Sequence, residues 1–397
     1  MSVGLLVGFV MACQVGCVGR EAPPSRIASH SPAPIRTQAA QFAPPAPPVV
    51  PDTTKTYRSV TALTVAPQDV PPSSDLERWV QSLMQRGITM VLIDIGTSAG
   101  SNPIVFEDGR RATGIYFRSQ WADTIRDIFG ELLPLAHQQG LSVFGAVSPR
   151  RINWVDPTLG WQDHSYDAVH RQLRLSPYLD LFHPGFQEYL VGLLTDLADT
   201  GVDGILFRND VSLGPYDGFS PFGVRGFERD FHTRTDPAQF FTGIIPAPQA
   251  PALGHGPAQP FPAEYWRWAG WKARERVKIL ERLGHAMRLH GNTRHVALEI
   301  HPEAVTDPRV ALVKYGEDLL EAKRRFQYFL LRSASQSSSP GHQTSVIIDQ
   351  MKGLLGSAER IWTTIPVSSD DAEQIGISSR TDREQLGMDI GLIYQKN

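Results

Sequence analysis

The stretch VDGILFRND, residues 202–210, decides the fold of this chain. Its middle is a short apolar run, which is typical of a buried strand, and it ends abruptly in polar residues. Apolar residues at helical spacing over 186–197, followed by Gly201 as a stop, predict a helix directly before it. In a parallel α/β protein, a carboxylate just past the carboxyl end of a strand stands in the ligand crevice. Asp210 is therefore the first candidate for chemistry; the alternative is that it caps the following turn.

Seven further strand-like runs surround this stretch, and helical patterns separate most of them. The expected strands are 60–65, 89–95, 141–147, 295–300, 326–331, 360–366 and 388–394. The expected helices are 74–86, 121–139, 263–290, 316–325 and 344–355. This alternation over residues 57–397 predicts an α/β fold, a (β/α)8 TIM barrel with long βα loops. An open doubly wound sheet is the alternative, but no phosphate-binding glycine motif opens any of these helices.

The amino-terminal end predicts export. Residues 3–11 form an apolar run, and the only cysteines of the 397-residue chain, Cys13 and Cys17, follow at once. This pattern resembles a bacterial lipoprotein signal, so we expect residues 1–17 to be a signal segment with lipidation at Cys17 or Cys13. A plain signal peptide or a short membrane anchor is the alternative. The expected location is the cell envelope, at the periplasmic face of the outer membrane.

A proline-rich segment separates this end from the folded part. Residues 18–56 are rich in Pro, Ala and Ser, a composition that cannot assemble an apolar core and predicts a disordered tether. The formal net charge of the whole chain is -3, which excludes an electrostatic case for nucleic-acid binding. Contact with a membrane is expected only through the lipid anchor.

Polar residues at the ends of the predicted strands form the candidate site, because strand ends on one face of a barrel converge on one mouth. They are Asp94, Arg150, Arg208, Asn209, Asp210, Glu299 and His301. The long loops add aromatic residues on the same face, among them Trp154, Trp161 and Tyr216. Aromatic platforms with scattered carboxylates suit a sugar ring, which has an apolar face and a rim of hydroxyls. The alternative is that these aromatics only pack the loops down.

Glycoside cleavage normally requires two carboxyl groups that flank the scissile bond. Asp210 is the candidate acid, and Glu299, on the neighbouring strand, is its candidate partner. The Arg208 guanidinium opposes a general-acid role, because a nearby cation favours the ionised form of a carboxyl. Neither a metal site nor a cofactor is expected, since the histidines lack ligand spacing and no Gly-x-Ser-x-Gly elbow is present.

The blocks LDLFHP at 179–184 and DGILF at 203–207, with the helix between them, resemble a known family. They are similar to the C-terminal glycoside-hydrolase-like barrel of the exported poly-β-1,6-N-acetylglucosamine deacetylases of Gram-negative biofilm systems. The likeness extends through 264–290 and 326–331, and more broadly to family-ten-like glycosidase barrels. The resemblance implies binding, and endo-cleavage, of partially deacetylated poly-N-acetylglucosamine at the barrel mouth, and contact with polysaccharide export machinery.

One motif of that family differs here. It continues as Phe-His-Asp-Asp where residues 207–210 read FRND, so Asp210 is retained and Asn209 replaces the first acid. We therefore expect an exported glycoside hydrolase-like lipoprotein, with a catalytically inactive carbohydrate-binding barrel that assists export as the alternative. A surface lipoprotein that serves only protein contacts is a third hypothesis. No deacetylase activity is expected, because the proline-rich segment stands where that family has its metal-dependent domain.

Overall fold

The computed structural model describes residues 61–97, 104–105, 111–209, 211–241, 261–291, 293–332, 340–366 and 391–394. The chain divides into two compact units, 1–49 and 50–397, and all the described residues belong to the second. The predicted signal segment, the tether, Cys13, Cys17 and Asp210 lie outside the described residues. None of the described helices combines the length and the apolar character that a membrane span requires.

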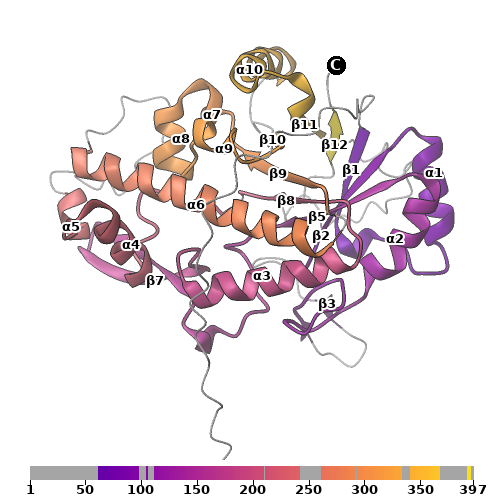
Figure 1. Cartoon of the computed structure of the whole chain (residues 1–397), viewed down its shortest axis with the longest axis horizontal. Helices are drawn as coiled ribbons and strands as arrows, with labels where there is room; N and C mark the ends of the chain where they lie inside the picture. The colour runs from indigo at the N-terminus through magenta and orange to yellow at the C-terminus, as the bar shows by residue number, and fades with distance from the viewer. Residues whose placement is uncertain are drawn as a thin grey trace, which may run out of the picture. The chain divides into compact units, whose positions relative to one another are not determined.

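Eight strands close into one barrel at the places that the sequence predicts (Figure 1). Around the barrel they are β1 (Thr61–Val65), β2 (Met90–Asp94), β5 (Ser142–Val147), β8 (Gly204–Phe207), β9 (His295–Ile300), β10 (Tyr328–Leu331), β11 (Ile361–Pro366) and β12 (Gly391–Tyr394). The first seven pair in parallel with one another along this order. Parallel strands are buried on both faces and read as continuous apolar runs, which is why the sequence located them. The predicted TIM-barrel class is confirmed.

The last strand has the predicted place but the opposite direction. β12 pairs antiparallel with both β11 and β1, and Tyr394 at its end lies opposite Thr61 at the start of β1. A (β/α)8 barrel has eight parallel strands, so the prediction is wrong in this detail. An antiparallel neighbour can receive the chain from the near end of β11, whereas a parallel neighbour requires a crossover to the far end.

Helices cover the outside of the barrel between the strands (Figure 1). They are α1 (Leu76–Gln85), α2 (Ile128–Gln139), α3 (Pro184–Asp199), α6 (Ala263–His290), α8 (Pro308–Tyr315), α9 (Leu319–Ala322) and α10 (Pro340–Leu355). The long helix α6 packs beside α3 along much of its length. The predicted helix at 263–290 is therefore confirmed with its boundaries.

Two other helices have boundaries that differ from the predicted ones. The helix predicted from residue 121 begins at Ile128, because the Asp127 carboxylate accepts a hydrogen bond from the Gly130 N–H and caps the helix there. The helix predicted at 316–325 is shorter. Gly316 ends α8 in the left-handed conformation, and the Asp318 carboxylate then caps α9.

Several connections at the carboxyl ends of the strands contain structure that the sequence does not reveal. A hairpin of β6 (Gln162–Asp167) and β7 (Gln172–Leu179) follows β5, and a shorter pair, β3 (Ile104–Val105) and β4 (Arg111–Ala112), follows β2. The connection after β8 holds α4 (Pro221–Phe231) and α5 (Pro237–Phe240), and α7 (Glu303–Thr306) follows β9. Short 3-10 helices lie at Pro67–Asp69 and Pro157–Leu159, and another, Ala358–Arg360, directly precedes β11. These connections are the long βα loops of the prediction.

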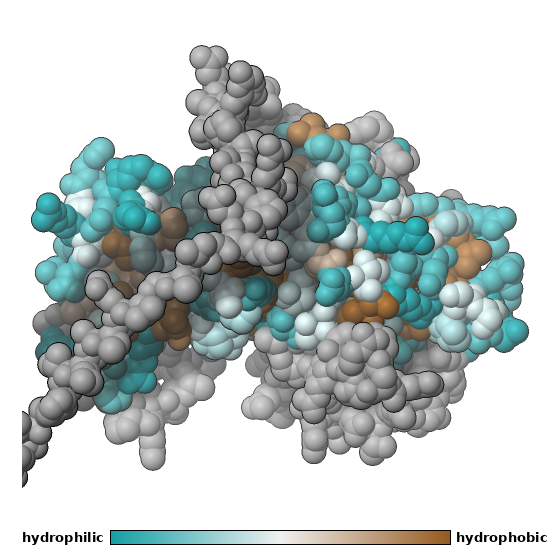
Figure 2. All heavy atoms as spheres, turned by 90° about the horizontal axis from the view of Figure 1, so that it is seen from below, coloured by the Kyte–Doolittle hydropathy of each residue, from teal (hydrophilic) through white to brown (hydrophobic). Residues whose placement is uncertain are grey.

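Two groups of apolar side chains form the core. The inner faces of the strands fill the barrel with Ala62, Met90, Leu92, Phe144, Ala146, Leu206, Ala297, Leu330 and Trp362. The other group packs between the barrel and the surrounding helices. Where side chains are described on the face shown in Figure 2, hydrophilic residues predominate and apolar patches are small. The apolar residues of the chain are therefore used mainly inside the fold.

The substitution Gly204→Ala is expected to destabilise the barrel by about 1–3 kcal/mol. A Cβ at this position on β8 would lie 2.2 Å from the ring of Phe144, which fills the barrel interior. The free energy of unfolding, measured with urea, tests this. Gly353→Ala in α10 is the control, because no atom lies within 4 Å of an added Cβ there. It should be neutral or stabilise the protein by up to about 1 kcal/mol; equal losses in both variants would contradict the packing argument.

Candidate active site at the barrel mouth

The carboxyl ends of β2 and β8 contribute an exposed ion pair. Arg208, one residue past β8, places a guanidinium nitrogen 3.1 Å from the Asp94 carboxylate at the end of β2. Their side chains are 24% and 37% exposed, so the pair is open to solvent. Tyr116 is buried nearby, and burial followed by the Asp94 charge raises the pKa of its phenol to about 12. The structure thus brings together two residues, Asp94 and Arg208, that the strand ends predicted to meet.

Asn209 is the link between the end of β8 and two buried carboxylates. Its backbone N–H donates a hydrogen bond to Glu299 Oε2 at 2.8 Å. Its side-chain amide donates to Glu317 Oε1 and, at 3.4 Å, to the Tyr315 carbonyl. Only 2% of Asn209 is exposed. This buried, neutral side chain therefore stands between Glu317 and the Tyr315 carbonyl and donates to both.

Glu299 lies on β9 with 8% of its surface exposed. Its carboxylate accepts the hydrogen bond from Asn209, and a guanidinium nitrogen of Arg332 lies 3.8 Å away. Both partners are donors or cations, which match a carboxylate that offers only acceptors. Glu299 is therefore bonded to the residue that directly precedes Asp210 in the chain.

His301 follows β9 and is held on two sides. Its backbone N–H donates to Glu317 Oε2, and its ring Nδ1 lies 3.0 Å from Glu317 Oε1. The ring stacks on Tyr315, with centroids 3.6 Å apart. The Tyr315 hydroxyl in turn donates to Glu303, and burial followed by this contact raises the pKa of the phenol. The candidate His301 thus belongs to the same group of side chains as Asn209 and Glu299.

Arg150 has a different position from these residues. It is only 3% exposed, and its guanidinium donates to Asp163 at 2.6 Å and to the Leu179 and Ser212 carbonyls. These partners belong to the β6–β7 hairpin and to the segment after β8. Arg150 therefore fastens these two connections to each other below the surface, and the structure does not place it with the polar residues of the mouth.

Arg150 belongs to a group of five ionisable side chains, of which Asp163, Asp180 and Lys272 are also buried and Asp217 is partly exposed. Lys272, on α6, donates to the Gly214 and Asp217 carbonyls at 2.8 Å, and burial lowers its pKa to about 8. Three carboxyl groups thus face two cations. Burial, with a further contribution from the Asp163 charge, raises the pKa of Asp180 to about 7. The Asp180 carboxyl therefore retains its proton well above the ordinary range of a carboxyl.

The stability of the protein is expected to fall as the pH rises from about 4 to about 7 because of Asp180. In the unfolded chain this carboxyl ionises at its ordinary value, whereas in the folded protein its pKa is about 7. The contribution of Asp180 to the free energy of unfolding is fully present below the pKa of this group in the unfolded chain. It is lost as the pH rises through the pKa of the group in the folded protein, which is about 7. Urea unfolding between these limits, on the parent and on Asp180→Asn, measures the effect. The variant should show a shallower fall, and identical pH profiles would contradict the assignment.

The predicted aromatic residues of the loops are half-buried and make defined contacts. The Trp154 indole donates to the Tyr189 hydroxyl at 2.7 Å. Trp161 packs against Tyr189 with ring centroids 5.4 Å apart, and Tyr216 packs against Phe241 at 5.0 Å. Trp154 and Trp161 therefore pack their connection onto α3, and Tyr216 packs within the connection after β8, which is the kind of contact that the alternative to sugar binding predicts. Each also keeps part of its surface open to solvent.

Two central residues of the site escaped the sequence analysis. Glu317 lies in the turn between α8 and α9, within a segment that was predicted to be helical. Arg276, on α6, is buried and is attracted by Glu317 and Glu299, although burial lowers its pKa. A signal for Arg276 exists, because it continues the buried stripe of Trp268 and Lys272 at helical spacing. The sequence around Glu317 gives no comparable signal.

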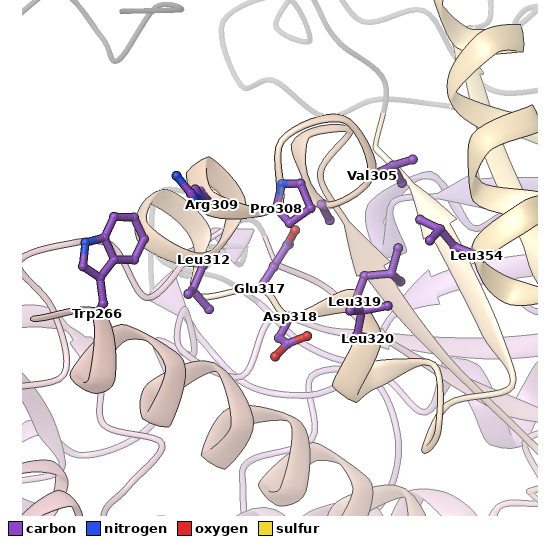
Figure 3. Close-up of a pocket in the computed structure, with 11 residues that line it drawn as sticks. Trp266, Val305, Pro308, Arg309, Leu312, Glu317, Asp318, Leu319, Leu320 and Leu354 are labelled. Carbon is purple, nitrogen blue, oxygen red and sulfur yellow. The ribbon is translucent and has the colours of Figure 1, made fainter. Parts of the chain in front are cut away.

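A groove of about 580 Å³ lies beside this site and shares Glu317 with it. Its lining is mainly apolar and comes from α6, α7, α8, α9 and α10. Figure 3 shows Glu317 between Leu312 and Leu319, with Trp266 at one end of the lining and Leu354 at the other. Among the described residues, no group of three or more His, Cys, Asp or Glu side chains is placed to hold a metal ion.

No family model matches the sequence, and no curated protein matches it. Solved structures similar to this chain include the catalytic domain of a β-amylase from Paenibacillus polymyxa, at 10% identity and a TM-score of 0.47, with 79% of this chain and 88% of that chain covered. A β-galactosidase from Bacillus circulans sp. alkalophilus has 11% identity and a TM-score of 0.49, with 73% and 42% covered. The GH20 exo β-N-acetylglucosaminidase from Vibrio harveyi, in complex with N-acetylglucosamine, has 10% identity and a TM-score of 0.37, with 69% and 41% covered. This chain spans less than half the length of the last two, and the fold assignment rests on the strand order of the barrel.

Proposed function

We propose that this protein is a glycoside hydrolase that binds and cleaves an exopolysaccharide of the poly-N-acetylglucosamine type at the barrel mouth. The observation that carries the proposal is the hydrogen bond between the Asn209 backbone and Glu299. It joins the ends of two neighbouring strands and sets a carboxylate beside the residue that precedes Asp210. Most glycoside hydrolases use a pair of carboxyl groups that flank the scissile bond.

In the proposed reaction Asp210 is the acid and Glu299 is the base. Asp210 gives its proton to the glycosidic oxygen as the bond from that oxygen to the anomeric carbon breaks. A water molecule forms the new bond to the anomeric carbon, and its proton passes to the Glu299 carboxylate. The buried, accepting position of Glu299 supports this role.

The proposed binding surface combines the polar and aromatic residues of the mouth. Asp94, Arg208 and His301 supply hydrogen-bonding groups, and Trp154, Trp161 and Tyr216 supply partly open rings. Asn209 orients the Glu299 carboxylate through the hydrogen bond from its backbone N–H. Arg150 is left out of this surface because it is buried and its donors are engaged by the connections.

A catalytically inactive barrel that binds the polymer and assists its export is the second candidate. Two observations favour it. The amide of Asn209 stands where the resembling family has an acid, and Arg208 neutralises Asp94, the exposed carboxylate of the mouth. A barrel of this kind would bind the saccharide and leave its length unchanged.

The proposed location is the periplasmic face of the outer membrane, with a lipid on Cys17 or Cys13. The sequence pattern at residues 3–17 supports this. Metabolic labelling with a fatty acid in cells that produce the full chain tests it, with Cys17→Ser and Cys13→Ser compared. Loss of label in one variant identifies the modified cysteine, and label in neither parent nor variants overturns the anchor.

Incubation with partially deacetylated poly-β-1,6-N-acetylglucosamine tests the function. Products are analysed by mass spectrometry, and binding is measured by calorimetry on the parent and on Asp210→Asn. Shorter oligomers from the parent alone would support the hydrolase and its acid. Binding without cleavage would support the second candidate. Absence of both would overturn the amino-sugar proposal.

A further inference from the structure

Glu317 is a buried carboxylate in the short turn between α8 and α9. The side chain is 2% exposed, although the turn that it occupies only connects α8 to α9. Both of its oxygens are engaged: Oε1 faces the Asn209 amide and His301 Nδ1, and Oε2 accepts the His301 backbone N–H. A buried carboxylate is costly unless several donors compensate it, so a connecting turn alone does not explain this residue.

The partners of Glu317 are the residues that follow β8 and β9. Asn209 is bonded to Glu317 through its side chain and to Glu299 through its backbone. The orientation of the Asn209 amide therefore also fixes the N–H that Glu299 accepts. On the other side, the carboxylate at Nδ1 favours a proton on that nitrogen of His301, which leaves Nε2 as the acceptor of the ring.

A buried cation completes the group. Arg276, on α6, is 3% exposed and is attracted by both Glu317 and Glu299. Asn209 thus bonds to both carboxylates, and the positive charge of Arg276 attracts both of them. Because the two carboxylates share the Asn209 donor, a change at one of them alters the contact of the other.

We infer that Glu317 is a positioning residue of the mouth, which holds Asn209 and His301 so that Glu299 keeps the geometry needed for proton transfer. This inference rests on the proposed hydrolase function. It assigns to Glu317 no contact with the saccharide. Its loss should lower kcat by a larger factor than it raises KM, because Glu317 acts on the saccharide only through other residues, whereas the loss of a carboxylate that bound substrate would mainly raise KM.

A cycle of three variants in the full chain tests the inference. Glu317→Gln should lower kcat about 10–100-fold, with KM changed by a clearly smaller factor. Asn209→Asp should lower Tm, because it sets two buried carboxylates against each other. In the double variant Asn209→Asp/Glu317→Gln, the amide is at position 317 and the carboxylate at position 209, so donor and acceptor are exchanged. This variant should recover much of the lost Tm and part of the lost kcat.

Glu321→Gln is the matched control. This carboxylate lies on α9 and pairs with Arg325, away from the β8 and β9 ends, and its side chain is 14% exposed. Its kcat and KM should equal those of the parent. Unchanged kcat in Glu317→Gln, or additive Tm losses in the double variant, would overturn the positioning role while the parent remained active. A parent that cleaves no polymer would instead overturn the proposed function and the catalytic part of this inference together, leaving the Tm cycle to report on the contact itself.

Discussion

Replacing Glu299 by glutamine should lower the rate of polymer cleavage by about 10²–10⁴-fold, the usual contribution of a positioned general base. The amide keeps the size of the side chain and an oxygen that can accept the Asn209 N–H, but it cannot take a proton from water. The affinity for the saccharide should change little. The measurement is kcat from the rate of oligomer release, with the Kd of the same polymer determined by calorimetry.

Glu264→Gln provides the control for this prediction, because Glu264 is exposed in the first turn of α6. The same chemical change there should leave both kcat and Kd unaltered. If Glu299→Gln retained the parental rate, Glu299 would not be the base, and the Asp210 acid would need another partner. If it lost binding as well as cleavage, the carboxylate would serve to hold the saccharide.

The largest loss of stability is expected from Trp268→Ala, at about 3–5 kcal/mol of unfolding free energy. Trp268 is fully buried on α6 and stacks on Phe219 with ring centroids 5.0 Å apart. Phe227 meets it edge-on at 5.3 Å, and Trp271 stacks on it at 5.3 Å. Removal of the indole would leave a cavity at the point where the connection after β8 packs onto α6. Urea unfolding measures the loss.

Trp266→Ala is the comparison for Trp268→Ala, since Trp266 is two residues away on the same helix. Its side chain is only partly buried and lines the open groove. A clearly smaller loss of stability is expected, because solvent can fill the space that the indole leaves. Similar losses in the two variants would show that the aromatic packing around Trp268 does not dominate the stability of this region.

The barrel could be predicted from the sequence because its strands are apolar on both faces. The strand at 295–300 and the helix at 263–290 match the structure at both ends. The β6–β7 hairpin was not predicted. The first four residues of β7 alternate polar and apolar, but all four are exposed and mark no buried face, and β6 is polar apart from Tyr166. Its position depends on groups from other parts of the chain, such as the Arg150 side chain and the backbone N–H of Phe219.

The candidate site was predicted only in part. Convergence of strand ends anticipates the contacts of Asp94 with Arg208 and of Asn209 with Glu299. It cannot anticipate Glu317, because this residue reaches the site from a helix-to-helix turn. Nor could strand position distinguish Arg150, which the connections after β5 and β8 cover, from residues that remain open.

The direction of β12 decides where the barrel is joined to the rest of the chain. Tyr394 lies opposite Thr61, so the chain enters the barrel and leaves it at adjacent points. Both points belong to the end of the barrel at which the parallel strands begin, and the candidate mouth is at the other end. A segment attached before β1 or after β12 is thus joined to the barrel at the end opposite the candidate mouth.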